Sequence, residues 1–425
     1  MRIAMLSYHT CPLATLGGKD TGGMNVYVRE ITRQLGVMGI HVDVFTRSQN
    51  EHVPHVLHDL GYGNRIVHLP AGPEYPLPKA ELVTYLPQFV ERIREFADSK
   101  GITYDIIHSH YWMSGMAAIE LKKYWHVPTI QMFHTLGLMK NRVAQFPEEM
   151  EGEYRIEGER EVLKTADKVI AATSAEYAQL IWLYQANADK IIVLSPGVDV
   201  GKFYPIPPDE AKEYIGVPPC GRMLLFVGRI EPLKGLDILI EAIGIMRQNE
   251  VLKNYPFCLA IIGGEPDEGD ETTNDEMSRI KALTEQYGLS DLITFLGKRN
   301  QDSLPYYYSA AEAVVVPSQY ESFGMVALEA MACGTPVVAS QIGGLAYLVQ
   351  DGLTGYTVPV DEPAELANRL TTLLQDPDLR EKMGKQAVIV AQDYAWNRIA
   401  DKLLAVYNEL LGNSTGDQTS TGAGM

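Results

Sequence analysis

The sequence has few cysteines, a deficit of basic residues and no long apolar run. Its four cysteines are far apart and form no C-x-x-C pair, which favours reduced thiols. No apolar run reaches the roughly 18 residues that a membrane-spanning helix needs. The N-terminus, MRIAMLSYHT, also lacks the apolar core and cleavage site of a signal peptide. We therefore expect a cytoplasmic protein with no integral membrane association.

The charge balance limits the partners further. Lys and Arg number 36 against 54 Asp and Glu, a formal net charge of −18. Such an acidic chain is not expected to bind nucleic acid or an anionic membrane through its overall field. A phosphorylated ligand would need a few cations placed locally. With 46% hydrophobic residues in 425, the chain can fill sizeable cores, which excludes a wholly disordered protein.

Short β-rich runs, among them the predicted strands His41–Arg47 and Met223–Val227, alternate with helical runs such as the predicted helix Met325–Ala332. This alternation predicts βαβ units and parallel sheets. The alternation is interrupted at residues 195–220, which hold six prolines, and then restarts. The predicted fold class is α/β, with two doubly wound Rossmann-like domains. The expected divisions are residues 1–198, a linker at 199–219, a second domain at 220–393, a helix at 394–411 that packs back on the first domain, and a disordered tail at 412–425.

A glycine-rich loop, HTCPLATLGGKDTGG, connects the first predicted strand to the first predicted helix. Free backbone N–H groups and the helix dipole can meet an anion or a polar sugar there. The loop lacks the spacing of a dinucleotide fingerprint, and Asp20 after Lys19 excludes a P-loop. A ligand loop is favoured over a plain flexible connection.

In the second half, GRIEPLKG places Arg229 and Lys234 directly after a predicted strand. Two cations at the start of a βα unit suit a diphosphate. Downstream, YESFGMVALEAMACGTPVVAS carries Glu321 and Glu329, with Gly324 between them at a predicted helix start. Two carboxylates there can accept hydrogen bonds from sugar hydroxyls. The alternative is a pair of glutamates on a solvated helix face.

The loop TGGMNV, the element GRIEPLKG and the E-x7-E pair followed by GTPVVAS occur in this order across the linker. In these motifs the chain resembles the retaining group-1 (family 4) glycosyltransferases of the GT-B fold, over residues 1–411. The resemblance implies an active-site cleft between two domains. It also implies that the backbone after the first glutamate cradles the donor's sugar and phosphate. The implied donor-binding residues are Gly23, Arg229, Lys234, Ser322, Phe323, Gly324 and Glu329, with Glu321 at the transferred sugar.

Within that family, AGPEYPLPKAEL, HSHYWMSG, FHTLGLMKN and YRIEGERE are most similar to D-inositol-3-phosphate glycosyltransferases, with sucrose-phosphate synthases as near neighbours. The resemblance implies that Lys79, Tyr111, Thr135 and Arg155 hold an acceptor phosphate and that Asn25 contacts the acceptor. Two cations and two hydroxyls can satisfy a phosphate monoester. The alternatives are a surface lysine at Lys79 and a helix face of ion pairs at Arg155.

The resemblance also places His134 beside the transferred sugar, and we take it and Glu321 as candidate catalytic residues. The alternative for His134 is a capped core histidine. No residue is placed as an obvious covalent nucleophile, and retention in this family is described as same-face attack assisted by the donor phosphate. Asp376-Pro377-Asp378 is the D-x-D triplet of this sequence, but it sits at a predicted helix boundary, where Asp commonly caps. The resemblance implies that GT-B donors are bound without a D-x-D metal site, so neither a metal nor another essential cofactor is expected. A UDP-sugar is expected as a substrate.

The favoured reading is transfer of N-acetylglucosamine from a UDP donor onto a small phosphorylated polyol such as 1D-myo-inositol 3-phosphate. A second is transfer of glucose to fructose 6-phosphate, as in sucrose-phosphate synthases. A third, from another class, is a non-catalytic nucleotide-sugar-binding protein, which the two motif carboxylates and two cations argue against. The sequence leaves a homodimer open.

Overall fold

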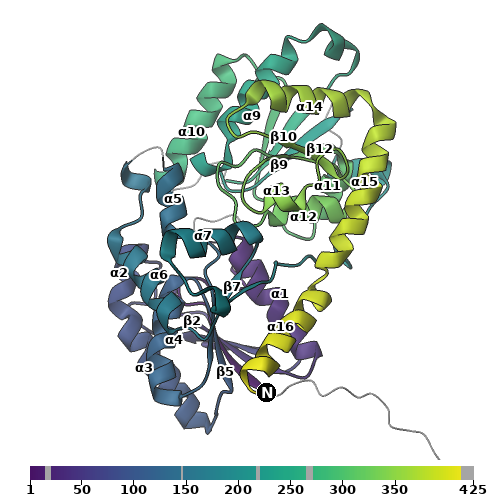
Figure 1. The fold of residues 1–425 in the computed structure, drawn as a ribbon. Helices are drawn as coiled ribbons and strands as arrows, with labels where there is room; N and C mark the ends of the chain where they lie inside the picture. Colours follow the sequence, from purple (N-terminus) through teal and green to yellow (C-terminus); the bar gives the residue numbers. More distant parts are fainter. Residues whose placement is uncertain (15–20, 145–146, 217–220, 265–270, 413–425) are drawn as a thin grey trace, which may run out of the picture.

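The computed structural model describes residues 1–14, 21–144, 147–216, 221–264 and 271–412. They form two lobes, each built on one sheet, with the N-terminal lobe below the C-terminal lobe in Figure 1. This confirms the predicted pair of doubly wound α/β domains. Among the described helices, none combines the length and the apolar character that crossing a membrane requires.

The first sheet has the strand order β3-β4-β2-β1-β5-β6-β7-β8. All neighbouring strands pair in parallel except β3 with β4, which is antiparallel. Its strands are β1 (Arg2–Leu6), β2 (His41–Arg47), β3 (Val56–Leu57), β4 (Arg65–Leu69), β5 (Ile106–His110), β6 (Thr129–Met132), β7 (Lys168–Ala171) and β8 (Ile191–Val193). Its helices are α1 (Gly23–Val37), α2 (Lys79–Leu82), α3 (Leu86–Lys100), α4 (Trp112–Trp125), α5 (Gly137–Val143), α6 (Glu153–Thr165) and α7 (Ser174–Tyr184).

The second sheet is parallel throughout, in the order β11-β10-β9-β12-β13-β14. Its strands are β9 (Met223–Val227), β10 (Cys258–Ile262), β11 (Ile293–Gly297), β12 (Ala311–Val316), β13 (Val337–Ser340) and β14 (Gly355–Val358). The remaining helices are α8 (Pro208–Ile215), α9 (Leu236–Arg247), α10 (Glu271–Gln286), α11 (Leu304–Ala310), α12 (Met325–Ala332), α13 (Leu345–Leu348), α14 (Pro363–Gln375), α15 (Pro377–Ala391) and α16 (Trp396–Leu410).

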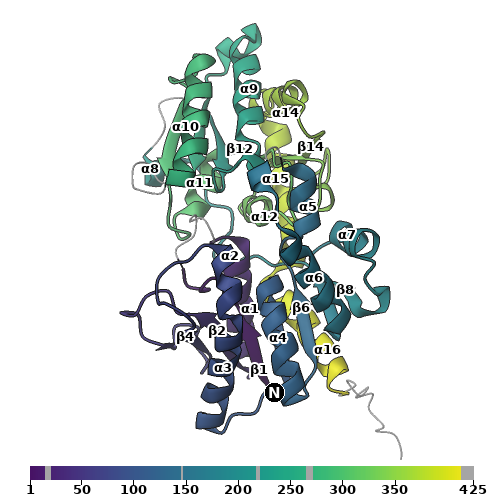
Figure 2. The same cartoon turned by 90° about the vertical axis from the view of Figure 1, so that its left-hand side faces the viewer.

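Helix α16 returns to the N-terminal lobe and packs against α1, so the chain crosses between the lobes twice (Figures 1 and 2). The two crossings are bonded together, because Val198 N–H donates to the Tyr394 carbonyl (2.8 Å) and Trp396 N–H donates to the Val198 carbonyl (3.2 Å). Trp396 packs edge-on to Tyr27 of α1, with ring centroids 5.5 Å apart. One apolar cluster continues from the α1 side of the first sheet through Val198 and Trp396 to α12.

Two expectations need correction or refinement. Cys258, expected as a reduced thiol, is disulfide-bonded, whereas Cys11 and Cys333 are free. The stretch 199–219 is not a bare linker, since α8 forms within it and packs against α11 of the second domain. Residues 413–425 of the expected disordered tail and residues 15–20 of the glycine-rich loop lie outside the described residues.

The strand order fixes where a ligand can bind. In doubly wound sheets, ligands bind beyond the carboxyl ends of the strands where the order reverses. These points lie between β1 and β5 in the first sheet and between β9 and β12 in the second. The loop of residues 7–22 and Tyr111 follow the first pair of strands, and Arg229 and Glu321 follow the second pair.

Candidate functional site

The two loops predicted to hold the donor lie side by side in the second domain. Gln319 N–H donates to the Leu233 carbonyl (2.9 Å), which ties the loop after β12 to the loop after β9. Lys234 Nζ then lies 2.7 Å from Glu321 Oε2, and both side chains are partly exposed. The structure therefore brings together one predicted phosphate-binding cation and the first glutamate of the motif.

Arg229 stands at the carboxyl end of β9, where its Nη1 lies 2.7 Å from Glu231 Oε1. Its side chain keeps 35% of its surface exposed. Both predicted donor cations thus pair with carboxylates, and both stay partly exposed, so that a phosphate can compete for them.

Gly343 and Gly344 let a second loop pack directly on the backbone of Glu321–Phe323. A Cβ on Gly343, which has φ 50°, would lie 1.9 Å from the Glu321 carbonyl oxygen. A Cβ on Gly344 would lie 2.4 Å from the Phe323 Cα. Only glycine fits either position, so this pair sets the shape of the loop that carries the first motif glutamate.

Helix α12 begins directly after this loop, with Gly324 as its N-cap at φ 105°. Ser322 is partly exposed and Phe323 is buried, with the Phe323 ring packed on Tyr394. Across the cleft, a Cβ on Gly23, the first residue of α1, would lie 3.1 Å from Met325 Sδ, the first residue of α12. The amino ends of two helices from different lobes therefore face the same space, and both favour negative charge there.

Glu329 lines a cavity of about 270 Å³ between the lobes, together with Arg29, Lys202 and Gln301. Its Oε2 accepts a hydrogen bond from the Tyr308 hydroxyl (2.8 Å). Burial raises the pKa of Glu329 to about 7, while the Tyr308 and Gln301 hydrogen bonds oppose that shift. The two motif glutamates thus differ: Glu321 is ion-paired in a loop, and Glu329 is a buried acceptor in the cavity.

Asn25 is buried at the start of α1, and its amide is used within the chain. Its Oδ1 accepts from Gly22 N–H (2.9 Å), and its Nδ2 donates to Thr10 Oγ1 and the Cys11 carbonyl (both 2.8 Å). These bonds join the loop after β1 to the helix N-terminus. Asn25 therefore shapes the glycine-rich loop, and its contact with an acceptor stays a prediction.

The four residues predicted to hold the acceptor phosphate converge on the Tyr111 ring. The guanidinium carbon of Arg155 lies 4.9 Å from the ring centroid, and Lys79 Nζ lies 5.8 Å from it. Arg155 Nη2 donates to the Thr135 carbonyl (2.9 Å) and to Thr135 Oγ1 (3.1 Å). Residues from four separate segments of the first domain therefore form one cationic cluster.

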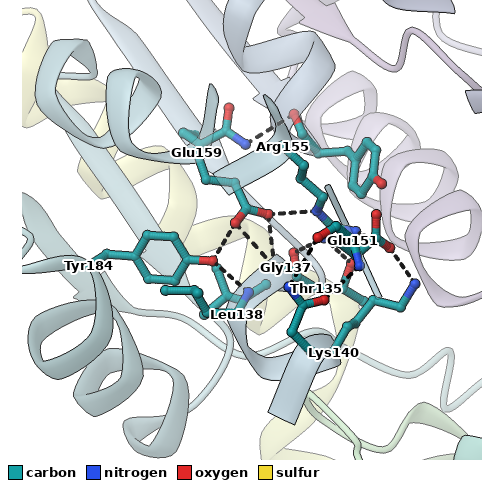
Figure 3. Close-up of polar contacts among 12 residues, drawn as sticks. Thr135, Gly137, Leu138, Lys140, Glu151, Arg155, Glu159 and Tyr184 are labelled. Atoms are coloured by element: carbon teal, nitrogen blue, oxygen red, sulfur yellow. Dashed lines mark hydrogen bonds and ion pairs between the residues drawn. The ribbon is translucent and has the colours of Figure 1, made fainter. Parts of the chain in front are cut away.

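Arg155 is the centre of a buried polar network (Figure 3). Its side chain is 1% exposed and ion-pairs with Glu151 (Nη1 to Oε1, 2.7 Å) and Glu159 (Nε to Oε1, 2.9 Å). Glu159 is fully buried and also accepts from Gly137 N–H and the Tyr184 hydroxyl. Such an arrangement satisfies a buried cation that would otherwise be costly in a low-dielectric interior.

His134 follows β6 with a left-handed backbone, φ 64°, and lies under Tyr27. Its Nε2 is 3.0 Å from His110 Nδ1. Burial, with smaller contributions from His108 and His9, lowers the pKa of His134 to about 3. The ring is therefore neutral near pH 7, which suits hydrogen bonding to a sugar hydroxyl better than carrying a proton.

Sequence reasoning missed two charged residues of the cluster around Arg155, Lys140 and Glu151. Lys140 Nζ lies 2.5 Å from Glu151 Oε1. Burial alone would raise the pKa of Glu151, but Arg155, Lys140 and Lys79 together lower it below its usual value. A signal was present, since Glu151, Arg155 and Glu159 are spaced four apart, the spacing of ion pairs along a helix, although the helix itself begins only at Glu153. Among the described residues, no group of three or more His, Cys, Asp or Glu side chains is arranged to hold a metal ion.

Comparison with known proteins covers nearly the whole chain. Residues 21–202 match the family described as Glycosyltransferase Family 4, and residues 209–389 match Glycosyl transferases group 1. A D-inositol 3-phosphate glycosyltransferase from Actinosynnema mirum is 38% identical over 96% of this chain and 97% of its own length. One from Corynebacterium jeikeium is 39% identical, again over 96% of this chain and 97% of its own length.

Solved structures agree with this relationship. A sucrose-phosphate synthase from Thermosynechococcus elongatus superposes with a TM-score of 0.88 at 34% identity, covering 97% of this chain and 100% of that one. Anabaena HepE in complex with UDP-glucose shares the fold, with a TM-score of 0.73 at 20% identity over 96% of this chain and 100% of that chain. Both support the GT-B architecture. The chain is therefore a glycosyltransferase that belongs to the group 1, family 4 glycosyltransferases of the GT-B fold.

Proposed function

We propose that this enzyme transfers N-acetylglucosamine from UDP-N-acetylglucosamine to 1D-myo-inositol 3-phosphate with retention of configuration. The observation that carries the proposal is the cluster of Lys79, Tyr111, Thr135 and Arg155 at the carboxyl edge of the first sheet. Two cations and two hydroxyls match the charge and the hydrogen-bonding capacity of a phosphate monoester. The names of the relatives at 38–39% identity agree with this acceptor.

On the donor side, we assign the diphosphate to Arg229, Lys234 and the facing amino ends of α1 and α12. The donor would replace the carboxylates of Glu231 and Glu321, which pair with these cations. Glu321 would then be released toward the transferred sugar, and Glu329 would accept hydrogen bonds from the ribose. His134 would bind the sugar as a neutral ring.

With two cations and two helix N-termini supplying positive charge, we infer that transfer needs no divalent cation as an essential cofactor. Full activity should persist in excess chelator. Complete loss of transfer in chelator, restored only by magnesium or manganese, would contradict this inference.

A second candidate is transfer of glucose to fructose 6-phosphate. It is favoured by the similarity to the Thermosynechococcus elongatus sucrose-phosphate synthase, at a TM-score of 0.88. Both acceptors carry a phosphate monoester, so the cationic cluster suits either.

The experiment is a matrix of donors and acceptors with product detection by mass. The donors are UDP-N-acetylglucosamine, UDP-glucose and their ADP and GDP counterparts. The acceptors are inositol 3-phosphate, fructose 6-phosphate and both parent compounds without phosphate. We expect product only with the phosphorylated acceptors, most with inositol 3-phosphate. Proton NMR of the product should show the donor's anomeric configuration retained. Equal use of unphosphorylated inositol would contradict the proposal.

A further inference from the structure

We propose that the Glu151 carboxylate occupies the acceptor's phosphate position when no acceptor is bound, and that Lys140 is a third cation of that site. A dianionic acceptor then binds by displacing Glu151, which makes Glu151 a specificity-determining residue. The inference rests on the proposed phosphorylated acceptor and goes beyond it by naming two residues outside the four predicted ones.

The first step is that Arg155 has one exchangeable carboxylate partner. Its Nε is bonded to Glu159, which is fully buried and held by two further donors. Its Nη2 is bonded to the carbonyl and the hydroxyl of Thr135. Of its two carboxylate partners, only Glu151, which is bonded to Nη1, reaches solvent, since its side chain is 17% exposed and that of Glu159 is 0% exposed. A phosphate that binds Arg155 at Nη1 must therefore replace Glu151.

The second step is that the other cations meet at the same carboxylate. Lys140 comes from α5 and lies 2.5 Å from the oxygen that also pairs with Arg155. Lys79 acts electrostatically on the same Glu151 carboxylate and also approaches Tyr111. A carboxylate oxygen that contacts two cations and lies in the field of a third marks a place where anionic oxygens are strongly stabilised.

The third step is that Glu151 can leave without unfolding its surroundings. Its main chain is held independently by Asn141: Glu151 N–H donates to Asn141 Oδ1 (2.6 Å), and Asn141 Nδ2 donates to the Glu151 carbonyl (3.0 Å). Glu151 precedes α6, which begins at Glu153. The side chain can thus rotate toward solvent while the backbone that brings Lys140 and Arg155 together stays in place.

Charge balance explains the selectivity. Three cations and the two carboxylates of Glu151 and Glu159 leave the cluster with one formal positive charge. A phosphate dianion added to that set would make it net negative, whereas displacement of Glu151 leaves it neutral. An unphosphorylated polyol cannot provide the charge that replaces Glu151, so the carboxylate stays and excludes it.

The main test is Glu151→Gln, which keeps the shape and the Asn141 contacts and removes the competing charge. We measure the Kd for inorganic phosphate by ³¹P NMR titration, and kcat and KM for inositol 3-phosphate. Loss of an internal competitor should lower both the phosphate Kd and the acceptor KM by about fivefold or more, with little change in kcat. If Glu151 had only a structural role, Glu151→Gln would instead raise the phosphate Kd, because losing the carboxylate would loosen Arg155 and weaken phosphate binding.

The matched control is Glu153→Gln, the same charge change two residues away on a side chain that is 76% exposed and 3.5 Å from Arg160. It should leave both constants unchanged. Lys140→Met gives a second test that does not depend on Glu151→Gln folding well. It should raise the phosphate Kd by about tenfold and leave the donor KM unchanged. Its control, Lys123→Met, removes an exposed lysine that pairs with Glu120.

The outcomes separate the two proposals. If the wild type prefers phosphorylated acceptors but Glu151→Gln leaves the phosphate Kd unchanged or raises it, the role of Glu151 is overturned and the proposed function stands. If Lys140→Met binds phosphate as the wild type does, Lys140 is not a ligand. If the wild type uses unphosphorylated inositol equally well and neither Lys79→Ala nor Arg155→Lys affects phosphate binding, the proposed function itself fails.

Discussion

The two halves of the cleft are built differently although each lies at the switch point of a doubly wound sheet. The half proposed to bind the acceptor is a network of largely buried side chains, in which Arg155 is satisfied by Glu159, Glu151 and Thr135. The donor half relies on backbone approach, with Gly343 and Gly344 packed on a loop and with cations that stay partly exposed. In the first domain, the residues proposed to bind the ligand therefore also stabilise the fold. In the second domain, the residues proposed to bind the ligand contribute less to stability.

The physical reason lies in the burial of charge. A buried cation needs its counter-charges in the folded state whether or not a ligand is present. A partly exposed cation is solvated, so its ion pair contributes little to stability and can be exchanged for a ligand at low cost. Substitutions in the Arg155 network should therefore lower the stability of the fold. Substitutions of Arg229 and Lys234 should mainly lower the efficiency with which the donor is used.

The largest effect should come from Arg155→Ala. Removing the buried cation leaves Glu159 without its charge partner, which should destabilise the fold by about 3–5 kcal/mol. Thermal unfolding would show a marked fall in Tm, and any folded enzyme should have a raised acceptor KM with donor binding intact. The control is Arg160→Ala on the same helix, where the side chain is 44% exposed. A Tm for Arg155→Ala equal to that of the control would break the comparison.

On the donor side, Lys234→Ala and Arg229→Ala should each lower transfer efficiency by about 10- to 100-fold, the value of one charge-assisted hydrogen bond. Tm should hardly change, because both side chains are partly exposed. Steady-state kinetics with varied donor would measure this, and Lys253→Ala, an exposed lysine paired with Glu250, serves as the control. Wild-type turnover in both variants would mean that the diphosphate binds elsewhere.

Gly344→Ala tests the backbone-built loop. The added Cβ would meet the Phe323 backbone at 2.4 Å. Overpacking of this kind costs about 1–3 kcal/mol. We expect this strain to displace the loop, which should raise the donor KM and lower kcat. The affinity for phosphate at the proposed acceptor site should not change. Gly201→Ala is the control, because among the described residues a Cβ there would approach only Asp199 Oδ1, at 3.3 Å. Unchanged donor kinetics would show that the loop tolerates displacement.

The smallest expected effect is the pH dependence of stability that comes from one buried carboxyl in each domain, Glu176 in the first and Glu329 in the second. Burial raises the pKa of both Glu329 and Glu176 to about 7, from a usual 4.5. Between these values the folded chain binds more protons than the unfolded chain, so stability falls as pH rises from about 4.5 to 7. Above pH 7 the cost of the buried carboxylate is fully present.

Replacing either carboxyl by the amide, as Glu329→Gln or Glu176→Gln, should flatten that dependence and stabilise the fold at pH 8 on the order of 1 kcal/mol. Thermal unfolding at pH 5.5 and pH 8 would measure it. Only Glu329→Gln should also raise the donor KM, because Glu329 lines the cavity between the lobes. Equal donor kinetics in the two variants would argue against a ribose contact.

Much of the fold could be predicted because buried parallel strands are short apolar runs. His41–Arg47 and Met223–Val227 were predicted with the bounds that the structure has, as was the helix Met325–Ala332. The strand Gly355–Val358 was missed because four residues with glycine and threonine carry little periodicity. The helix Leu304–Ala310 was missed because Pro305 and three tyrosines resemble a loop with an aromatic cluster.

For the site, motif spacing and family resemblance named residues that the structure brings together, such as Lys234 with Glu321 and Arg155 with Thr135. They could not show that Glu151 pairs with Arg155. Seven carboxylates lie near Arg155 in the sequence, and only the folded structure shows that two of them, Glu151 and Glu159, contact it. Nor could they show that Asn25 is bonded internally, since that depends on the path of the loop after β1.

The return of α16 has a consequence for synthesis on the ribosome. The N-terminal domain is translated first, yet Tyr407 of α16 is hydrogen-bonded to His108 Nδ1 (2.7 Å) in β5, and Trp396 covers Tyr27 of α1. Until residues 396–410 emerge, the α1 side of the first sheet lacks its cover and exposes apolar surface. The domain made first is therefore completed last, and a nascent chain that has already folded its second domain must still recruit this helix to close the first.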